Sequence, residues 1–209
     1  MQSDQPKPEL TSSVDILERR AWNGARLIIL IGPGGAGKTT IASILAPITN
    51  RALIDLDREF SGLLGDIDQY IRSKGYPAYK AANSQIAQNL VSNLSGPTIL
   101  VMSSGFLSLD NSAAVLAENT KLLDSGYCIS LLPHADIEIA SDIIVDRQLR
   151  RGLYKDADRQ RQTFRERFAL YKAAGDMLVI SPASPHEIAN AIAKRLVSEG
   201  IGAPPLDPR

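Results

Sequence analysis

The stretch Leu27-Ile28-Ile29-Leu30-Ile31-Gly32-Pro33-Gly34-Gly35-Ala36-Gly37-Lys38-Thr39 decides the fold of this 209-residue chain. Its apolar first half is typical of a strand that is covered on both faces, as in a parallel sheet. Its second half matches the pattern G-x-x-x-x-G-K-S/T, in which glycines let backbone N–H groups turn toward phosphate oxygens. A helix should follow over residues 39–45 and end before Pro47, so that its positive N-terminal end adds to the anion site.

This loop predicts an ATP site. Lys38 should reach the β- and γ-phosphates, and the Thr39 hydroxyl should bind Mg²⁺. The alternative is a glycine-rich turn followed by a chance Lys-Thr pair, but the strand before it and the helix after it are the context that a phosphate loop needs. The expected nucleotide-binding residues are Gly32, Gly34, Gly35, Ala36, Gly37, Lys38, Thr39 and Thr40.

Further apolar segments alternate with helical ones along the chain. Strands are expected at 52–54, 98–102, 127–132 and 177–180, and helices at 14–22, 59–73, 78–93, 110–123, 135–149, 157–173 and 186–197. This alternation predicts an α/β fold with a parallel sheet and helices on both faces. The polar residues 1–12 and the Pro-rich residues 201–209 are expected to be loose tails around one domain, residues 13–200.

Composition argues against several classes of partner. Lys plus Arg and Asp plus Glu are both 23 and aromatic residues make up 5%, which does not favour nucleic acid or an anionic membrane. No apolar run approaches the roughly 20 residues of a membrane span. A single cysteine, Cys128, and a polar start indicate a reducing, cytoplasmic location. The expected partner is a small molecule, and the expected state is a monomer or a weak dimer.

Asp55 and Asp57 follow the second expected strand directly. Open α/β sheets place their ligands at the carboxyl ends of strands, and residues two apart in a strand face the same side. One carboxylate could therefore support Mg²⁺ while the other orients or deprotonates an acceptor hydroxyl. The alternative is that Asp57 only caps the helix that begins near Arg58.

These motifs together resemble the shikimate kinases. The loop at 32–39 followed by Asp55-x-Asp57 is similar to the opening of that family, and Arg150-Arg151-Gly152-Leu153 is similar to its lid motif Arg-Pro-Leu. The stretch from Arg167 to Asp176 resembles its Arg-x-x-Leu-Tyr-x-x-x-Ala-Asp pattern. The likeness covers about residues 24–198. It implies a three-layer P-loop fold with a five-stranded parallel sheet in the order 2-3-1-4-5, a substrate-binding region at about 57–95 and a mobile lid at about 148–163.

The resemblance also implies roles for single residues. Asp55 would support Mg²⁺, Asp57 would bind the acceptor hydroxyls as the base, and Arg151 would meet the γ-phosphate. Arg167 would pair with the acceptor carboxylate through two parallel hydrogen bonds. Arg147 is a candidate to stack on adenine.

The chain departs from the family pattern near the acceptor. The family has Phe-Arg-x-x-Glu where this chain has Tyr79-Lys80-Ala81-Ala82-Asn83. Lys80 therefore keeps the positive charge of the family's arginine but lacks its forked guanidinium group. The family's Gly-Gly-Gly is Ser103-Ser104-Gly105 here, which leaves Gly105 to approach the acceptor. The function expected is ATP-dependent phosphorylation of a hydroxyl group, with shikimate as acceptor. The alternatives are a related kinase for a sugar acid, nucleotide or antibiotic, and a catalytically silent ATP-binding regulatory module.

Overall fold

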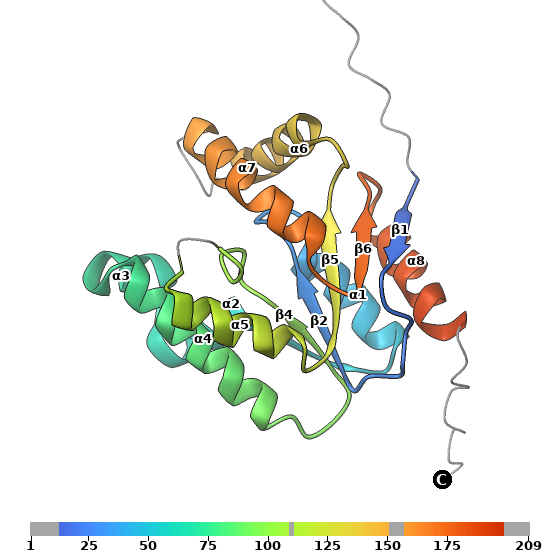
Figure 1. Ribbon diagram of the computed structural model, residues 1–209, viewed down its shortest axis with the longest axis horizontal. Coiled ribbons are helices and arrows are strands. Elements are labelled where there is room, and N and C mark those ends of the chain that lie inside the picture. Colours follow the sequence, from blue (N-terminus) through green and yellow to red (C-terminus); the bar gives the residue numbers. More distant parts are fainter. Residues whose placement is uncertain (1–12, 109–110, 151–156, 199–209) are drawn as a thin grey trace, which may run out of the picture.

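The computed structural model describes residues 13–108, 111–150 and 157–198, which build an α/β structure on one six-stranded sheet (Figure 1). The expected tails at 1–12 and 201–209 lie outside the described residues. The strand order across the sheet is β1-β6-β5-β2-β4-β3. The strands are β1 (Asp15–Glu18), β2 (Leu27–Ile31), β3 (Ala52–Asp55), β4 (Thr98–Val101), β5 (Tyr127–Leu132) and β6 (Met177–Ile180).

Helices cover both faces of this sheet. Figure 1 shows α1 and α8 together on one side and α4, α5 and α7 on the other. None of the helices in the described part of the chain combines the length and apolarity needed to cross a bilayer. The helices are α1 (Lys38–Ile48), α2 (Leu56–Leu64), α3 (Ile67–Lys74), α4 (Tyr76–Ser92), α5 (Ala113–Leu123), α6 (Ile137–Arg150), α7 (Ala157–Ala173) and α8 (Pro185–Ser198).

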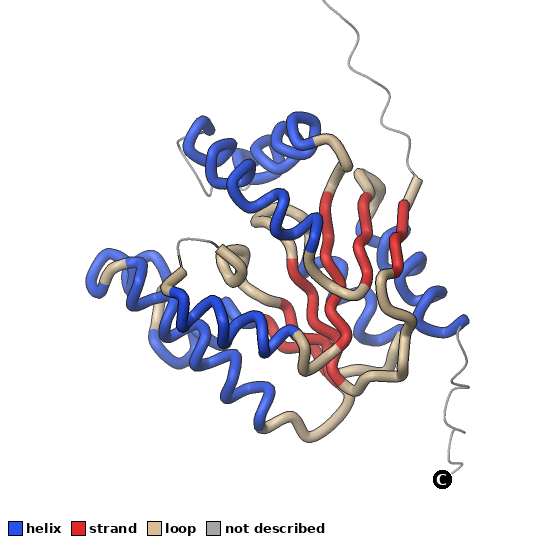
Figure 2. Tube along the Cα trace, viewed as in Figure 1, coloured by secondary structure: helices blue, strands red, loops and turns tan. Residues whose placement is uncertain are grey.

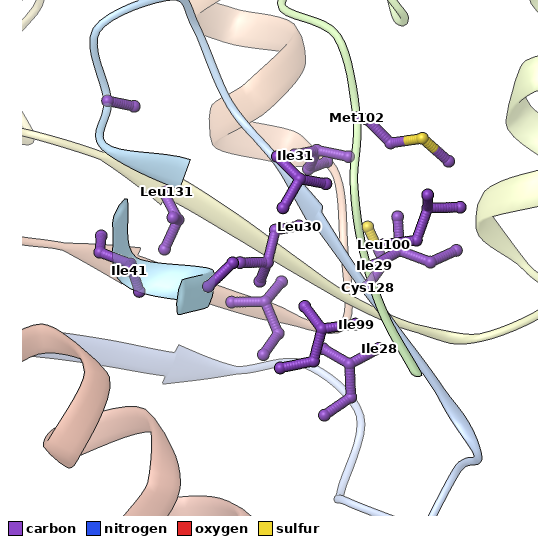
Figure 3. Packing of buried hydrophobic residues seen from close by; sticks show 14 of the residues in the cluster. Ile28, Ile29, Leu30, Ile31, Ile41, Ile99, Leu100, Met102, Cys128 and Leu131 are labelled. Carbon is purple, nitrogen blue, oxygen red and sulfur yellow. The ribbon is translucent and has the colours of Figure 1, made fainter. Parts of the chain in front are cut away.

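The core is centred on β2, which lies between β4 and β5 and is buried along its whole length. Figure 3 shows Ile28 and Leu30 of β2 among side chains of the neighbouring strands, such as Ile99 of β4. Cys128 of β5 is buried there too, and burial raises the pKa of its thiol. A strand covered on both faces explains why its sequence is a continuous apolar run.

The expected sheet of five parallel strands is wrong in its number of strands and in being all parallel, although the five expected strands do follow one another in the order 2-3-1-4-5. The sheet has six strands and is mixed, because β1 pairs antiparallel with β6 at one edge. Without β1, the parallel strands lie in the order β3-β4-β2-β5-β6. What is confirmed is the α/β class with helices on both faces.

The additional strand β1 lies where a helix was expected at 14–22. Its side chains alternate between exposed and half-buried, the period of a strand at a sheet edge. Distant groups hold this segment in place: the Arg20 guanidinium lies 2.7 Å from the Asp176 carboxylate, and the Arg19 guanidinium donates to the carbonyls of Ala174 and Gly175. These contacts join residues about 155 positions apart in the sequence. They outweigh the helical spacing of the apolar residues at 14–22.

Two helix boundaries also differ from expectation. Helix α1 continues through Pro47, which lies in its last turn, so little of the helical hydrogen bonding is lost. The helix expected at 59–73 is divided into α2 and α3 at Gly65, whose φ is +88°, and Asp66 caps α3 by accepting from the Gln69 amide at 2.8 Å.

The turn before β6 gives a test of backbone fit. Gly175 has φ of +86°, and a Cβ added there would lie 2.9 Å from the Cys128 carbonyl oxygen. We expect Gly175→Ala to lower the free energy of unfolding by about 2 kcal/mol, because a methyl group is strained in that conformation and collides with backbone. Urea unfolding measures this change.

Gly62→Ala is the matched control, because it adds the same methyl group inside α2 with no atom within 4 Å. It should raise stability by up to about 1 kcal/mol. Equal unfolding midpoints for the two variants would contradict the expectation.

Candidate active site

A cleft of about 900 Å³ opens at the carboxyl ends of the central strands. Figure 2 shows the loops after β2 and β4 between two groups of helices, α6 and α7 on one side and α2 to α5 on the other. Lys38, Asp57 and Arg167 all line this cleft, so residues from three distant parts of the sequence share one site. Open α/β sheets bind their ligands at this edge.

The loop from Gly32 to Gly37 has the backbone of a phosphate cradle. Gly35 and Gly37 have φ of +87° and +90°, which side chains rarely adopt. A Cβ at Gly32 would lie 2.6 Å from the Leu131 carbonyl oxygen, so β5 leaves no room for one. No side chain caps the N-terminus of α1 after Gly37. This arrangement directs backbone N–H groups and the helix dipole into the loop, as bound phosphate requires.

Lys38 is buried beneath that loop. Its Nζ donates to the carbonyl oxygens of Gly32 at 2.8 Å and of Pro33 at 3.1 Å. The ammonium group is therefore held at the wall of the cradle, where a phosphate would find a fixed positive charge.

Thr39 and Asp55 meet beside the loop. The Thr39 hydroxyl donates to Asp55 Oδ2 at 2.7 Å. Asp55 Oδ1 accepts from the backbone amides of Asp57 and Arg58, so Asp55 is the residue that caps α2. The alternative in which Asp57 is the cap is therefore wrong. Adjacent hydroxyl and carboxylate oxygens are the hard ligands that suit Mg²⁺.

Asp57 lies in the first turn of α2 and lines the cleft. Its Oδ1 accepts a hydrogen bond from the Ser103 hydroxyl at 2.5 Å, and the Ser103 oxygen accepts from Asn83 Nδ2 at 3.0 Å. The two aspartates thus serve different groups. The expectation that residues two apart share a strand face does not hold here, because the strand ends at Asp55.

Arg167 and Gly105 lie close together. Arg167 donates to the Ser104 carbonyl and to the Tyr76 hydroxyl, both at 3.4 Å. A Cβ at Gly105 would lie 2.9 Å from the Tyr76 hydroxyl oxygen and 3.7 Å from Arg167 Nη1. Gly105 therefore leaves the space that this guanidinium faces.

Lys80 is buried beside the same tyrosine. Its Nζ lies 4.7 Å from the centroid of the Tyr76 ring, in a cation–π contact. Tyr171 donates its hydroxyl hydrogen to the Ser104 carbonyl, and burial raises the pKa of Tyr171, which keeps it a neutral donor. Tyr76 lines the cleft and was not predicted, because nothing local in the sequence marks it as a cleft residue.

Helix α6 reaches over the phosphate loop. Arg147 Nη1 donates to the Gly35 carbonyl at 3.3 Å, and Gln148 Nε2 donates to the Gly34 carbonyl at 2.8 Å. Gln148 is another unpredicted cleft residue. Arg151 and Gly152 of the expected lid motif lie outside the described residues. Among the other arginines there, Arg161 pairs with Asp142 at 3.0 Å between α7 and α6.

Comparisons with known proteins identify the family of this chain. The model of the shikimate kinase family matches residues 34–197. The shikimate kinase of Helicobacter hepaticus is 29% identical over 166 residues, 79% of this chain and 92% of that protein. The pentafunctional AROM polypeptide of Clavispora lusitaniae is 27% identical over 115 residues, 55% of this chain, and the match spans only 7% of that protein.

A solved structure of shikimate kinase from Acinetobacter baumannii in complex with shikimate has a TM-score of 0.67 with this chain. The match covers 84% of this chain and 95% of the Acinetobacter baumannii chain, at 20% sequence identity. At this identity, the likeness shows the fold alone.

The buried Lys38 gives the test of the nucleotide side. Lys38→Met should weaken ATP binding by about tenfold or more, because it removes a charge-assisted hydrogen bond to phosphate. Isothermal titration with ATP measures the effect. Lys194→Met, on the exposed side of α8, is the control and should bind as the wild type does. Unchanged affinity in a folded Lys38→Met protein would contradict the role of Lys38.

Proposed function

The chain belongs to the shikimate kinase family, and on that basis we propose that it transfers the γ-phosphoryl group of ATP to a hydroxyl group of shikimate. It is a phosphotransferase that acts on a hydroxyl group and uses ATP with Mg²⁺. The observation that supports the substrate most is that Lys38, Asp57 and Arg167 line one cleft. A nucleotide and a small acceptor could then bind side by side.

The proposed reaction forms a bond from the acceptor oxygen to the γ-phosphorus while the bond to the bridging oxygen of ADP breaks. Asp57 orients the hydroxyl and takes its proton, since its carboxylate lines the cleft and can act as a general base. Lys38 stabilises charge on the phosphate oxygens. Mg²⁺, when bound, neutralises charge on the β- and γ-phosphates, and Thr39 and Asp55 would hold it.

The carboxylate of the acceptor would bind in the part of the cleft lined by Arg167. Arg167 offers a planar guanidinium that can donate two hydrogen bonds, with Lys80 adding positive charge and Gly105 adding space. On the nucleotide side, Arg147 would contact adenine and Thr40 would join the loop in binding phosphate. Arg151 is proposed to meet the γ-phosphate when the lid closes.

The proposal treats residues 13–200 as a single kinase domain, with the substrate-binding region at about 57–95 and the lid at about 148–163. We also propose that the protein is cytoplasmic, that it is a monomer or weak dimer, and that neither nucleic acid nor a membrane is its partner.

A second candidate is the same reaction on another small carboxylated acceptor. The observation that favours it is the contact of Lys80 with the Tyr76 ring, because this lysine replaces the forked arginine of the family pattern. A panel of hydroxy acids, followed by ADP release, separates the two candidates. Shikimate as the best acceptor supports the first proposal, and any other clear winner removes it.

Asp57 is tested by the isosteric change Asp57→Asn. Turnover should fall by about 10²- to 10⁴-fold, because an amide cannot accept the proton of the hydroxyl group. Steady-state ADP release with shikimate measures it. Asp66→Asn is the control, because asparagine also caps a helix well. Near-normal turnover in a folded Asp57→Asn protein would refute the role of Asp57.

Arg167 is tested by Arg167→Lys. The KM for shikimate should rise about tenfold with a smaller change in kcat, because lysine keeps the charge and loses the fork. The control is Arg165→Lys on the same helix, where the side chain pairs with Glu138 and lies outside the cleft. If the KM of the two variants were equal, carboxylate binding by Arg167 would be rejected.

A further inference from the structure

A buried chain of hydrogen bonds ends at Asp57. Asn83 lies on α4 and Ser103 follows β4, and their exposed fractions are 3% and 4%. Asn83 Nδ2 donates to Ser103 Oγ at 3.0 Å, and Ser103 Oγ donates to Asp57 Oδ1 at 2.5 Å. Asp57 lines the cleft. The bonds therefore lead from the protein interior to the residue that faces the acceptor.

The donors and acceptors fix the direction of this series of hydrogen bonds. An amide nitrogen can only donate, so the Ser103 oxygen must accept from Asn83. The single hydroxyl hydrogen of Ser103 is then directed to Asp57, whose ionised carboxylate can only accept. With the amide of Asn83 turned round, Ser103 would have one hydrogen for two acceptors. Asn83 thus sets the orientation of the Ser103 hydroxyl.

The consequence for Asp57 is that its two oxygens become unequal. Oδ1 is committed to a buried hydroxyl, and this bond limits rotation of the carboxylate. Oδ2 remains as the oxygen that an acceptor hydroxyl can approach. Bonds of this kind, from a neutral donor to a charged acceptor, are among the stronger ones in proteins.

We infer that Ser103, oriented by Asn83, is a positioning residue that fixes the Asp57 carboxylate with Oδ2 toward the acceptor hydroxyl. The inference deepens the proposed function and rests on it. Ser103 itself does not line the cleft, so its effect must pass through Asp57.

The activity test uses Ser103→Ala, Ser103→Thr, Asn83→Ala and the double variant Asn83→Ala/Ser103→Ala. Ser103→Ala should lower kcat for shikimate by about ten- to a hundredfold, with the KM for ATP unchanged. Ser103→Thr keeps the hydroxyl and should recover most of the loss. The double variant should be no slower than Ser103→Ala, because Asn83 acts through Ser103.

The control is Ser130→Ala. Ser130 is another fully buried serine, and its hydroxyl donates to the Tyr171 carbonyl at 2.7 Å, away from Asp57. Its loss should affect stability and leave kcat unchanged. Full kcat in Ser103→Ala, or equal losses in Ser103→Ala and Ser130→Ala, would overturn the inference.

A second measurement needs no acceptor. Urea unfolding of Ser103→Ala, Asp57→Ala and their double variant gives the coupling between the two residues. We expect the combined effect to differ from additivity by about tenfold in the unfolding equilibrium constant. Additive effects would overturn the inference. If the wild type left shikimate unphosphorylated while the coupling persisted, the proposed function would fail and the positioning of Asp57 by Ser103 would still be supported.

Discussion

The close approach of the phosphate loop to β5 is the constraint on which the rest of the site depends. Gly32 leaves β2 so near the Leu131 carbonyl that a Cβ would lie 2.6 Å from it. Only a glycine allows the chain to turn there, and only a fully buried β2 holds the turn in place. The helix α1 then starts at Lys38 with its N-terminus directed at the cleft. Without this turn, neither the cradle nor the position of Lys38 could form.

Asp55 and Asp57, at the end of β3 and the start of α2, have different partners although only one residue separates them. Asp55 ends the strand, caps α2 and accepts from Thr39, so it links α2 to the start of α1. Asp57 lies on the helix that Asp55 caps, lines the cleft and accepts a hydrogen bond from Ser103. A cap is normally a device of stability. Here it also sets the direction in which the next carboxylate points.

Two parts of the cleft are built by different means. Backbone groups and one buried lysine form the phosphate cradle, so its shape follows from a few glycines in a row. The other part of the cleft is built from α4, the β4 loop and α7, with Tyr76, Ser104 and Arg167 among its lining residues. Its shape and charge therefore depend on several contacts at once, and a change at any of them can alter which acid fits.

The sequence by itself determined the elements whose signals are local. The apolar runs give β2, β5 and β6 with their observed bounds, and Ser184 and Glu187 form the capping box that begins α8. The glycine pattern likewise predicts the phosphate loop. Local periodicity and capping hydrogen bonds are written in neighbouring residues, which is why these features can be inferred without a structure.

Only the tertiary structure decided the rest. β1 is a strand because it pairs with β6, which is distant in sequence, and Asp57 accepts from Ser103, 46 residues away. Tyr76 and Arg167 are 91 residues apart and meet in the cleft. Such partners are chosen by how helices pack on the sheet, and the free energy of that packing depends on the whole core rather than on the sequence near either residue.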